Sequence, residues 1–390
     1  MRSSASVLRH TYDAVVIGLG IMGSSALHHL SARGLRVLGV EARGPLHASG
    51  SSHGQTRIFR RAYWEGEQYV PLLSRSFDGW MALDDATPDT IALRSGGLFI
   101  GRPESTLVHG SRQTAERCGI AHEMLGADDV GRRFPAFRVQ EGAVAIYEPD
   151  ALVLFAERAR LAYLSRAVQQ GAHVVHGRSI RRLDSAAGSV SVVGEDWQVS
   201  CGAAVVTTGG WMGDLLPRDV ASLITPMRIP VFEFDVAAGT AADHLADRFP
   251  VFLYENTDGA LVYGLPRWQG SGGLKIGFHN RQLSPVGMDD DRDPPTDAER
   301  LELWRTVSEL LPGVRPTGSG TACVYTMTPD ESFFIGPSER AGIYYASACS
   351  GHGFKFAPGI GEALAQLVVD GTSEVDLVGF TPGRLHRDAT

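Results

Sequence analysis

Apolar runs and glycine turns near the start of the chain predict a strand, a helix and a second strand. Residues 11–17 (TYDAVVI) are mostly apolar or β-branched over the length of a strand. The hexapeptide GLGIMG follows at residues 18–23, and residues 24–32 have a helical composition. An apolar run at residues 36–40 ends on Glu41. The order is therefore strand, glycine-rich turn, helix, strand and acidic residue.

This order is typical of a dinucleotide-binding site. Gly18, Gly20 and Gly23 let backbone N–H groups approach a pyrophosphate at the helix N-terminus, where the helix dipole favours negative charge. Glu41 follows at about the required twenty residues, where a carboxylate accepts hydrogen bonds from a ribose. The acidic residue suits FAD and NAD equally and disfavours NADP, so the motif alone does not choose between the first two.

Later runs of the same character predict that this domain is discontinuous in sequence. Strand-like runs recur at residues 173–176, 203–208 and 343–348, and a helix is expected at residues 361–369. The fold is therefore expected to be mixed α/β with two domains. The Rossmann-like nucleotide-binding domain would comprise residues 10–92, 148–217 and 328–390, and the second domain residues 93–147 and 218–327.

The second domain is expected to be mostly an antiparallel β-sheet. Its segments contain short strand-like runs such as VFEFDV, GALVYG and GLKIGF. One helix is predicted at residues 297–311, because Thr296 and Glu299 have the spacing of a capping box and Pro312-Gly313 closes the stretch.

Composition excludes several classes of protein. The formal net charge of −8 and the isoelectric point near 5.9 argue against a nucleic-acid-binding protein. No apolar run approaches the ~20 residues that span a bilayer. The N-terminal residues 1–11 lack the apolar segment of a secretory signal, so we expect a short leader. The four cysteines form no Cys-x-x-Cys pair, which disfavours a disulfide framework or a metal site and suits the cytoplasm.

Lysine is unusually rare in this chain. Of 36 basic residues only Lys275 and Lys355 are lysines, and the others are arginines. Lysine differs from arginine where a compact ammonium or a shiftable pKa is required. The two lysines are therefore candidates for chemistry that a guanidinium cannot perform, with chance as the alternative.

Four clusters of polar and small residues carry the candidate chemistry. They are SSHGQTRIFRRAY at residues 51–63, GLKIGFH at 273–279, TACVYT at 321–326 and SGHGFKF at 350–356. Both lysines fall inside these clusters, which weakens the chance interpretation. Lys275, Gly277 and His279 would share one face of a strand.

With these clusters in this order, the chain resembles the family of monomeric sarcosine oxidase and N-methyltryptophan oxidase over nearly its whole length. The resemblance implies FAD as cofactor and a covalent bond from Cys323 to the flavin. It implies that Lys275 speeds the reaction of reduced flavin with oxygen and that Arg60 and Lys355 grip the substrate carboxylate. Residues that it places beside the flavin or the amine are His53, Arg57, Tyr325 and His279. Further contacts to the cofactor are implied for Gly18, Gly20, Gly23, Glu41, Ser51, Thr56, Gly351, Gly353 and Lys355.

The implied activity is oxidation of the CH–NH bond of an N-methyl or cyclic secondary amino acid. A hydride passes to flavin N5, water hydrolyses the imine, and oxygen is reduced to hydrogen peroxide. Phe252-Leu253-Tyr254 and Leu261-Val262-Tyr263 depart from the family pattern in segments that line the substrate site in the relatives, so the resemblance does not imply sarcosine itself as the substrate. Alternatives are a flavin-dependent amine dehydrogenase with another electron acceptor, a flavin-binding protein without turnover, and an NAD-dependent dehydrogenase. Cys323 as a small buried hydrophobe is the alternative to a covalent link.

Overall fold

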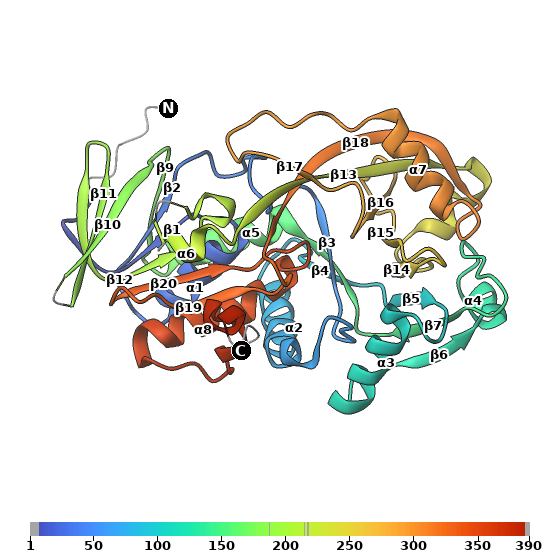
Figure 1. Ribbon diagram of the computed structural model, residues 1–390, viewed down its shortest axis with the longest axis horizontal. Coiled ribbons are helices and arrows are strands. Elements are labelled where there is room, and N and C mark those ends of the chain that lie inside the picture. The colour runs from blue at the N-terminus through green and yellow to red at the C-terminus, as the bar shows by residue number, and fades with distance from the viewer. Residues whose placement is uncertain (1–7, 187, 214, 217, 387–390) are drawn as a thin grey trace. The chain divides into compact units, whose positions relative to one another are not determined.

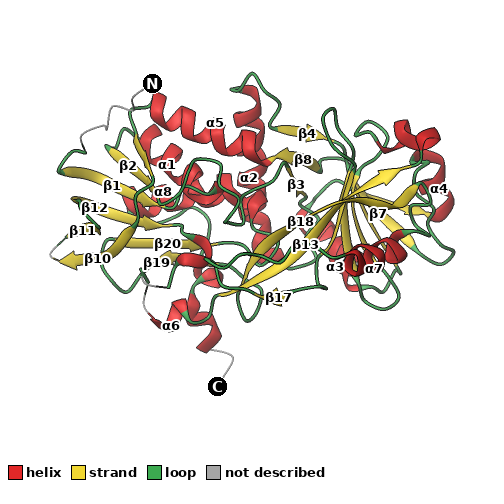
Figure 2. Cartoon of the chain, turned by 90° about the horizontal axis from the view of Figure 1, so that it is seen from above, coloured by secondary structure: helices red, strands yellow, loops and turns green. Residues whose placement is uncertain are grey.

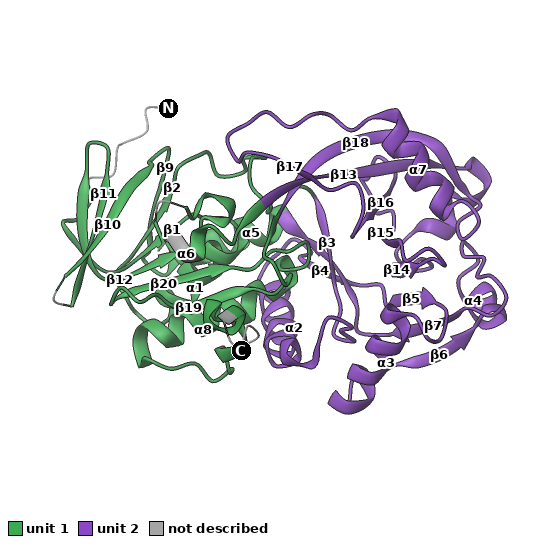
Figure 3. Ribbon diagram, in the orientation of Figure 1, with its two compact units in different colours: residues 1–54, 157–225, 326–390 green, residues 55–156, 226–325 purple. Residues whose placement is uncertain are grey.

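A computed structural model describes residues 8–386 apart from residues 187, 214 and 217. The first seven residues, which include most of the expected leader, lie outside the described residues. The chain divides into two compact units, drawn in two colours in Figure 3. Unit 1 comprises residues 1–54, 157–225 and 326–390, and unit 2 comprises residues 55–156 and 226–325.

The described part of unit 1 is built on an eight-stranded sheet with the strand order β10-β11-β12-β1-β2-β9 (Figure 1). Strand β20 pairs with β12, and β19 pairs with β20. The strands are β1 (Thr11–Ile17), β2 (Val37–Glu41), β9 (His173–His176), β10 (Ile180–Ala186), β11 (Ser189–Gly194), β12 (Gln198–Val206), β19 (Phe334–Pro337) and β20 (Ile343–Ser347). The helices are α1 (Ile21–Ala32), α5 (Ala156–Gln169), α6 (Arg218–Ala221) and α8 (Ala357–Asp370).

The centre of this sheet is parallel, and β1 lies between β12 and β2. Residues 14–17 of β1 are all buried, as expected for a strand with both faces covered. Helices α1 and α8 pack against each other, and Figure 2 shows them side by side. Their approach depends on Gly361, because a Cβ there would lie 2.2 Å from the Ser25 hydroxyl oxygen.

Unit 2 contains a nine-stranded sheet with the order β17-β13-β16-β15-β14-β5-β7-β6, and β18 pairs with β13. A separate three-stranded sheet has the order β3-β8-β4. The strands are β3 (Thr56–Phe59), β4 (Ala92–Arg94), β5 (Gly97–Gly101), β6 (Glu123–Gly126), β7 (Val144–Glu148), β8 (Leu152–Phe155), β13 (Thr225–Val236), β14 (Val251–Glu255), β15 (Leu261–Leu265), β16 (Leu274–Phe278), β17 (Ser284–Pro285) and β18 (Val314–Met327). The helices are α2 (Val70–Asp85), α3 (Thr106–Cys118), α4 (Ala127–Arg133) and α7 (Asp297–Val307).

The large sheet of unit 2 is mostly antiparallel, as the sequence predicts. The pairing of β14 with β5 is parallel, and it joins two segments far apart in the chain. One face of this sheet holds a phenylalanine-rich core, to which α7 contributes Leu303 and Val307. The predicted capping box is confirmed, because Thr296 and Glu299 each accept a hydrogen bond from the other's backbone N–H.

Several helix bounds differ from those expected. Helix α1 begins at Ile21 instead of residue 24, because the Ser24 N–H already donates to the Gly20 carbonyl and so includes the glycine turn in the first helical turn. Helix α7 ends at Val307, and residues 308–310 form a turn instead of continuing the helix. Helix α8 begins at Ala357, four residues before the predicted helix, and Pro358 is tolerated in its first turn.

The unit boundaries also fall at other positions than the expected domain boundaries. Residues 55–92 and 148–156, which we expected in the nucleotide-binding domain, belong to unit 2. The reason is strand pairing: β8 pairs with both β3 and β4, so these segments form a sheet of their own. In the part of the chain that the structure describes, no helix has the length and apolar character needed to cross a bilayer.

Candidate active site

The glycine turn after β1 forms a cradle in which each glycine is needed for a different reason. Gly18 has φ of +86°, a left-handed conformation that favours glycine. Gly20 is the N-cap of α1 and places no side chain over the helix end. A Cβ on Gly23 would lie 1.8 Å from the Gly18 carbonyl oxygen and 2.5 Å from the Thr207 hydroxyl. The turn is therefore as close to its neighbours as backbone allows. At the start of α1 the Ile21 N–H donates to the Ser52 hydroxyl at 3.0 Å, and the helix dipole favours an anion there.

Glu41 ends β2 beside this turn and is held as a carboxylate. It accepts hydrogen bonds from the backbone N–H of Leu19 (2.8 Å) and of Arg43 (3.0 Å). His47 Nε2 lies 3.6 Å from Glu41 Oε1. Burial opposes ionisation, but the nearby His47 ring and the hydrogen bonds from Leu19 and Arg43 outweigh it and hold the pKa of Glu41 below its ordinary value. An ionised carboxylate has further lone pairs, so Glu41 can also accept from ribose hydroxyls. The cradle and this acid fit a dinucleotide.

The third element of unit 1 is the turn at residues 350–353, which leads into α8. Ser350 has φ of +38° and Gly351 has φ of +77°. A Cβ on Gly353 would lie 1.7 Å from the Ala348 carbonyl oxygen, so no larger residue fits there. Lys355 follows, is 6% exposed, and donates from Nζ to the His352 carbonyl at 2.8 Å.

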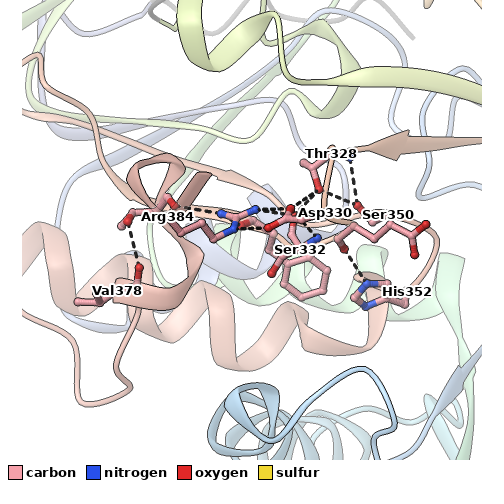
Figure 4. Close-up of polar contacts among 10 residues, drawn as sticks. Thr328, Asp330, Ser332, Ser350, His352, Val378 and Arg384 are labelled. Carbon is pink, nitrogen blue, oxygen red and sulfur yellow. Dashed lines mark hydrogen bonds and ion pairs between the residues drawn. The ribbon is translucent and has the colours of Figure 1, made fainter. Parts of the chain in front are cut away.

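Polar contacts of unit 1 hold this turn in place (Figure 4). The hydroxyls of Thr328 and Ser350 lie 3.3 Å apart, and a ring nitrogen of His352 lies 3.1 Å from the Glu331 carbonyl. Arg384 makes a two-pronged ion pair with Asp330, which ties the end of the described chain to the same loop. Because the turn is bound on several sides, the start of α8 and Lys355 have fixed positions within unit 1.

Two further predicted residues of unit 1 lie close to these elements. A ring nitrogen of His53 is 2.6 Å from the Gly50 carbonyl oxygen, and the His53 side chain is buried. The Ser51 hydroxyl lies 3.5 Å from the Thr326 hydroxyl, at the limit of a hydrogen bond.

In unit 2 the structure brings Lys275, Arg57 and Cys323 together. Lys275 lies on β16, opposite Glu233 of β13, and its Nζ donates to the Thr56 carbonyl at 2.8 Å. Burial and, to a smaller extent, the charge of Arg57 lower the pKa of Lys275 from 10.5 to about 7, while Cys323 and Glu233 act in the opposite direction. The amino group is therefore a desolvated base or acid near neutral pH, as candidate catalytic groups often are.

Tyr263, which the sequence analysis placed in a segment lining the substrate site without a specific role, joins this cluster. It faces Gly277 across the β15–β16 pair, and a Cβ on Gly277 would lie 2.8 Å from the Tyr263 hydroxyl. Burial raises the pKa of Tyr263, and the nearby Cys323 adds to this, so the phenol stays neutral. A hydrogen bond with Tyr325 acts in the opposite direction and links the two tyrosines. In the sequence, Tyr263 and Gly277 lie on two successive strands. Only the register between these strands shows that the two residues face each other.

His279 and Tyr325 extend the cluster, since their rings lie 6.2 Å apart. Trp64 packs edge-on against His279, with 6.3 Å between ring centroids. Arg57 is thus a neighbour of Lys275, Cys323, Tyr325 and His279 within one unit, although more than two hundred residues of the chain separate it from each of them.

Arg60 is 3% exposed and forms an ion pair with Glu65. It also donates to the Ala62 carbonyl at 3.2 Å, and its guanidinium lies 4.3 Å from the Tyr63 ring centroid. A buried arginine needs such compensation for its lost hydration. Arg60 belongs to unit 2 and Lys355 to unit 1, so their joint grip on a carboxylate remains a prediction.

Glu148 is a second residue that sequence analysis missed. It is fully buried at the end of β7, and its two carboxylate oxygens accept hydrogen bonds from the backbone N–H groups of Arg61 and Ala62 at 2.9–3.1 Å. Burial raises the pKa of Glu148, although these two N–H groups oppose the rise. Glu148 therefore fixes the backbone that follows Arg60. Its sequence neighbourhood, YEPD, carries no sign of this role.

Comparisons with known proteins show the family to which the chain belongs. A profile of the family described as FAD dependent oxidoreductase matches residues 13–367. Monomeric sarcosine oxidase of Streptomyces avermitilis is 37% identical over 96% of this chain and 98% of its own length. N-methyl-L-tryptophan oxidase of Yersinia pestis is 33% identical over 96% of this chain and 100% of its own.

Solved structures show the same fold at lower identity. L-proline dehydrogenase from P. horikoshii has a TM-score of 0.81 and 21% identity, covering 98% of this chain and 99% of that chain. NikD, described as an unusual amino acid oxidase essential for nikkomycin biosynthesis, has a TM-score of 0.80 and 21% identity, covering 96% and 98%.

We predict that Glu148→Ala destabilises the protein, because it leaves the buried N–H groups of Arg61 and Ala62 without an acceptor. Unpaired buried donors typically cost about 1–3 kcal/mol each, so the expected loss is roughly 3 kcal/mol. Glu148→Gln keeps one acceptor oxygen and should lose less. Urea unfolding followed by fluorescence measures both. The control is Glu141→Ala, which removes an exposed carboxylate from the preceding loop and should leave stability unchanged. Equal stability of Glu148→Ala and the unmodified protein would contradict the assignment.

Proposed function

Because the chain belongs to the family of FAD-dependent oxidoreductases, we propose that it oxidises the CH–NH bond of a secondary amino acid with oxygen as electron acceptor. The substrate is an N-methyl or cyclic amino acid, by analogy with the relatives named for sarcosine and N-methyl-L-tryptophan. The observation that carries the proposal is the desolvated Lys275 amino group, held beside Arg57 and Cys323. The products are an imine, which water hydrolyses, and hydrogen peroxide.

The bound flavin supplies the redox chemistry by accepting a hydride at N5 and returning the electrons to oxygen. Within unit 1 the glycine cradle offers backbone N–H groups to the pyrophosphate and Glu41 accepts from the ribose. Residues proposed to hold FAD are Gly18, Gly20, Gly23, Glu41, Ser51, Thr56, Gly351, Gly353, Lys355 and, through a covalent bond, Cys323.

Substrate binding is assigned to Arg60 and Lys355, which neutralise the carboxylate. Each side chain is almost fully buried, so a carboxylate that reaches it is desolvated and binds strongly to the fixed cation. Arg60 already has Glu65 as a partner, and the Lys355 ammonium donates to the His352 carbonyl. The contacts around the Arg60 and Lys355 side chains therefore hold both cations in defined positions.

The remaining site residues act near the reacting groups. Arg57 and Lys275 provide two positive charges, which favour negative charge as it develops on the ring system and on oxygen. His53 is oriented by Gly50, and His279 and Tyr325 form an aromatic pair that excludes water beside the amine. Tyr263, neutral because of burial, extends this apolar wall.

A dehydrogenase that uses another acceptor is the second candidate, and a flavin-binding protein without turnover is the third. A fixed cation next to the flavin serves oxygen reduction, because superoxide forms as an anion. This favours the oxidase. The release of hydrogen peroxide in an assay across a panel of amino and imino acids separates the oxidase from the other two, since only an oxidase produces it in step with substrate loss.

We predict that Cys323 holds FAD covalently. When the protein is precipitated with acid, the yellow colour should stay with the polypeptide, and Cys323→Ala should release it into the supernatant. Cys349→Ala is the matched control, since Cys349 is likewise a half-buried cysteine outside any disulfide. Free flavin in the supernatant of fully loaded unmodified protein would show that Cys323 is a small buried hydrophobe instead.

We predict that Lys275→Met slows reoxidation of the reduced flavin by oxygen far more than it slows reduction by substrate. The loss of one preorganised charge is worth roughly 3 kcal/mol, or about a hundredfold in rate. Lys275→Arg restores the charge in a poor position and should recover part of the rate. Stopped-flow absorbance measures the two half-reactions separately. An equal loss in both would make Lys275 a structural or substrate-binding residue.

The pH profile of the same rate provides a further check. With a pKa near 7, Lys275 is protonated below neutral pH and loses its charge as the pH rises. Reoxidation assisted by this charge should therefore fall as pH rises through about 7, and Lys275→Met should remove that dependence. A flat profile in the unmodified enzyme would contradict a titrating Lys275.

We predict that the substrate must carry a carboxylate. An amino acid should be oxidised well, and its amide or its decarboxylated amine poorly. Charged hydrogen bonds are worth roughly 1.5–3 kcal/mol each, so the loss should be on the order of a hundredfold or more in kcat/KM. Arg60→Ala and Lys355→Ala should each weaken turnover of the acid and barely change the poor rate with the amine. If neutral amines react as fast as their acids, the substrate class is wrong.

A further inference from the structure

Trp64 lies four residues after Arg60, and the chemistry proposed above makes no use of it. Its backbone packs directly onto helix α3 at Gly110. A Cβ on Gly110 would lie 3.2 Å from the Trp64 Cβ and 3.3 Å from its Cα. Any side chain at residue 110 would therefore press Trp64 away from α3, and glycine allows the close approach.

The segment that carries Trp64 is fixed at several points within unit 2. Glu148 binds the N–H groups of Arg61 and Ala62, as described above. The hydroxyl of Thr114, one turn further along α3, donates to the Tyr63 carbonyl at 2.9 Å. With contacts on both sides of it, Trp64 has a backbone position that is set by the fold and not by a mobile loop.

The indole ring reaches from this segment to the candidate active site. It meets the imidazole of His279 edge-on, with ring planes at 90°. His279 in turn lies against Tyr325, which is linked to Tyr263. Trp64 and Tyr263 also pack against the same apolar cluster. Trp64 therefore forms one continuous aromatic layer with His279, Tyr325 and Tyr263. Of these four residues, Trp64 is the nearest in sequence to Arg60.

Hydrogen bonding does not explain why a tryptophan occupies this position. The indole Nε1 is enclosed and has no hydrogen-bond partner among the described residues. A buried tryptophan N–H usually finds an acceptor, and leaving it unpaired is unfavourable. The property that the indole contributes here is its size.

We infer that Trp64 is the specificity-determining residue of the proposed reaction. The inference rests on the proposed function, in which Arg60 binds the substrate carboxylate. The α-carbon is bonded directly to that carboxylate, so its side chain must lie close to the rigid segment that carries both Arg60 and Trp64. The indole is then a wall that limits the size of this side chain. The enzyme prefers secondary amino acids with a small α-substituent or none.

The test compares kcat/KM for sarcosine, N-methyl-L-alanine, N-methyl-L-phenylalanine and N-methyl-L-tryptophan in the unmodified enzyme and in Trp64→Ala. In the unmodified enzyme kcat/KM falls along this series. In Trp64→Ala the ratio of the N-methyl-L-tryptophan value to the sarcosine value rises at least tenfold, the lower end of the discrimination that one hydrophobic pocket achieves. Trp64→Phe gives an intermediate ratio and keeps most of the contact with Gly110.

The matched control is Trp304→Ala. Trp304 is half-buried in unit 2, packs against a different apolar cluster and donates to the Val314 carbonyl at 3.1 Å. Trp304→Ala leaves the ratio of the N-methyl-L-tryptophan kcat/KM to the sarcosine kcat/KM unchanged. A ratio in Trp64→Ala and Trp64→Phe equal to that of the unmodified enzyme, with normal flavin content, would overturn the inference.

A binding measurement separates this inference from the proposed function. Acetate and indole-3-acetate are titrated into the oxidised holoenzyme, and the flavin absorbance reports binding without turnover. Trp64→Ala strengthens binding of indole-3-acetate relative to acetate at least tenfold. If this occurs while no secondary amino acid is oxidised, the role of Trp64 in limiting ligand size is supported and the proposed reaction is contradicted. If turnover is normal but neither the kcat/KM ratio nor the binding ratio changes, the proposed reaction is supported and the role of Trp64 is contradicted.

Discussion

The position of the Lys275 amino group is the constraint on which the candidate site depends. A desolvated ammonium is unfavourable unless neighbours compensate for its lost hydration, and here the Thr56 carbonyl and the charge of Glu233 do so in part. The balance is incomplete, since Arg57 adds a second positive charge and the pKa of Lys275 falls to about 7. Strands β3, β13 and β16 must hold their register to keep this arrangement. The result is a region of uncompensated positive charge, which stabilises negative charge that develops during a reaction.

The same principle explains the surroundings of Arg60. Buried ions are stable only when they are paired and hydrogen-bonded. Arg60 has Glu65 and the Ala62 carbonyl, while Glu148 has two backbone N–H groups. Because each of these contacts fixes backbone as well as charge, the segment after β3 is rigid. In unit 2 the same contacts therefore compensate the buried charges of Arg60 and Glu148 and hold the backbone of the site in position.

Unit 1 contributes through its backbone. The turn at residues 18–23 and the turn at residues 350–353 each depend on a glycine whose missing Cβ would lie less than 2 Å from a carbonyl oxygen, namely Gly23 and Gly353. Such turns expose N–H groups and helix ends, which bind phosphate and other anions without a charged side chain. Glu41 adds the one acceptor that a ribose needs. Unit 1 therefore offers backbone donors together with the Glu41 carboxylate and the Lys355 ammonium, and unit 2 offers the other charged and aromatic side chains.

The sequence by itself determined what depends on local order. Strand β1, the glycine turn and Glu41 follow from residues within one stretch, and the Thr296–Glu299 capping box follows from spacing alone. The rarity of lysine marked Lys275 without any structure. Only the tertiary structure decided that Tyr263 meets Cys323 and Arg57, that Glu148 binds the segment after Arg60, and that residues 55–92 belong to unit 2. These contacts join segments far apart in the chain, and their energies depend on burial and strand register, which no local pattern encodes.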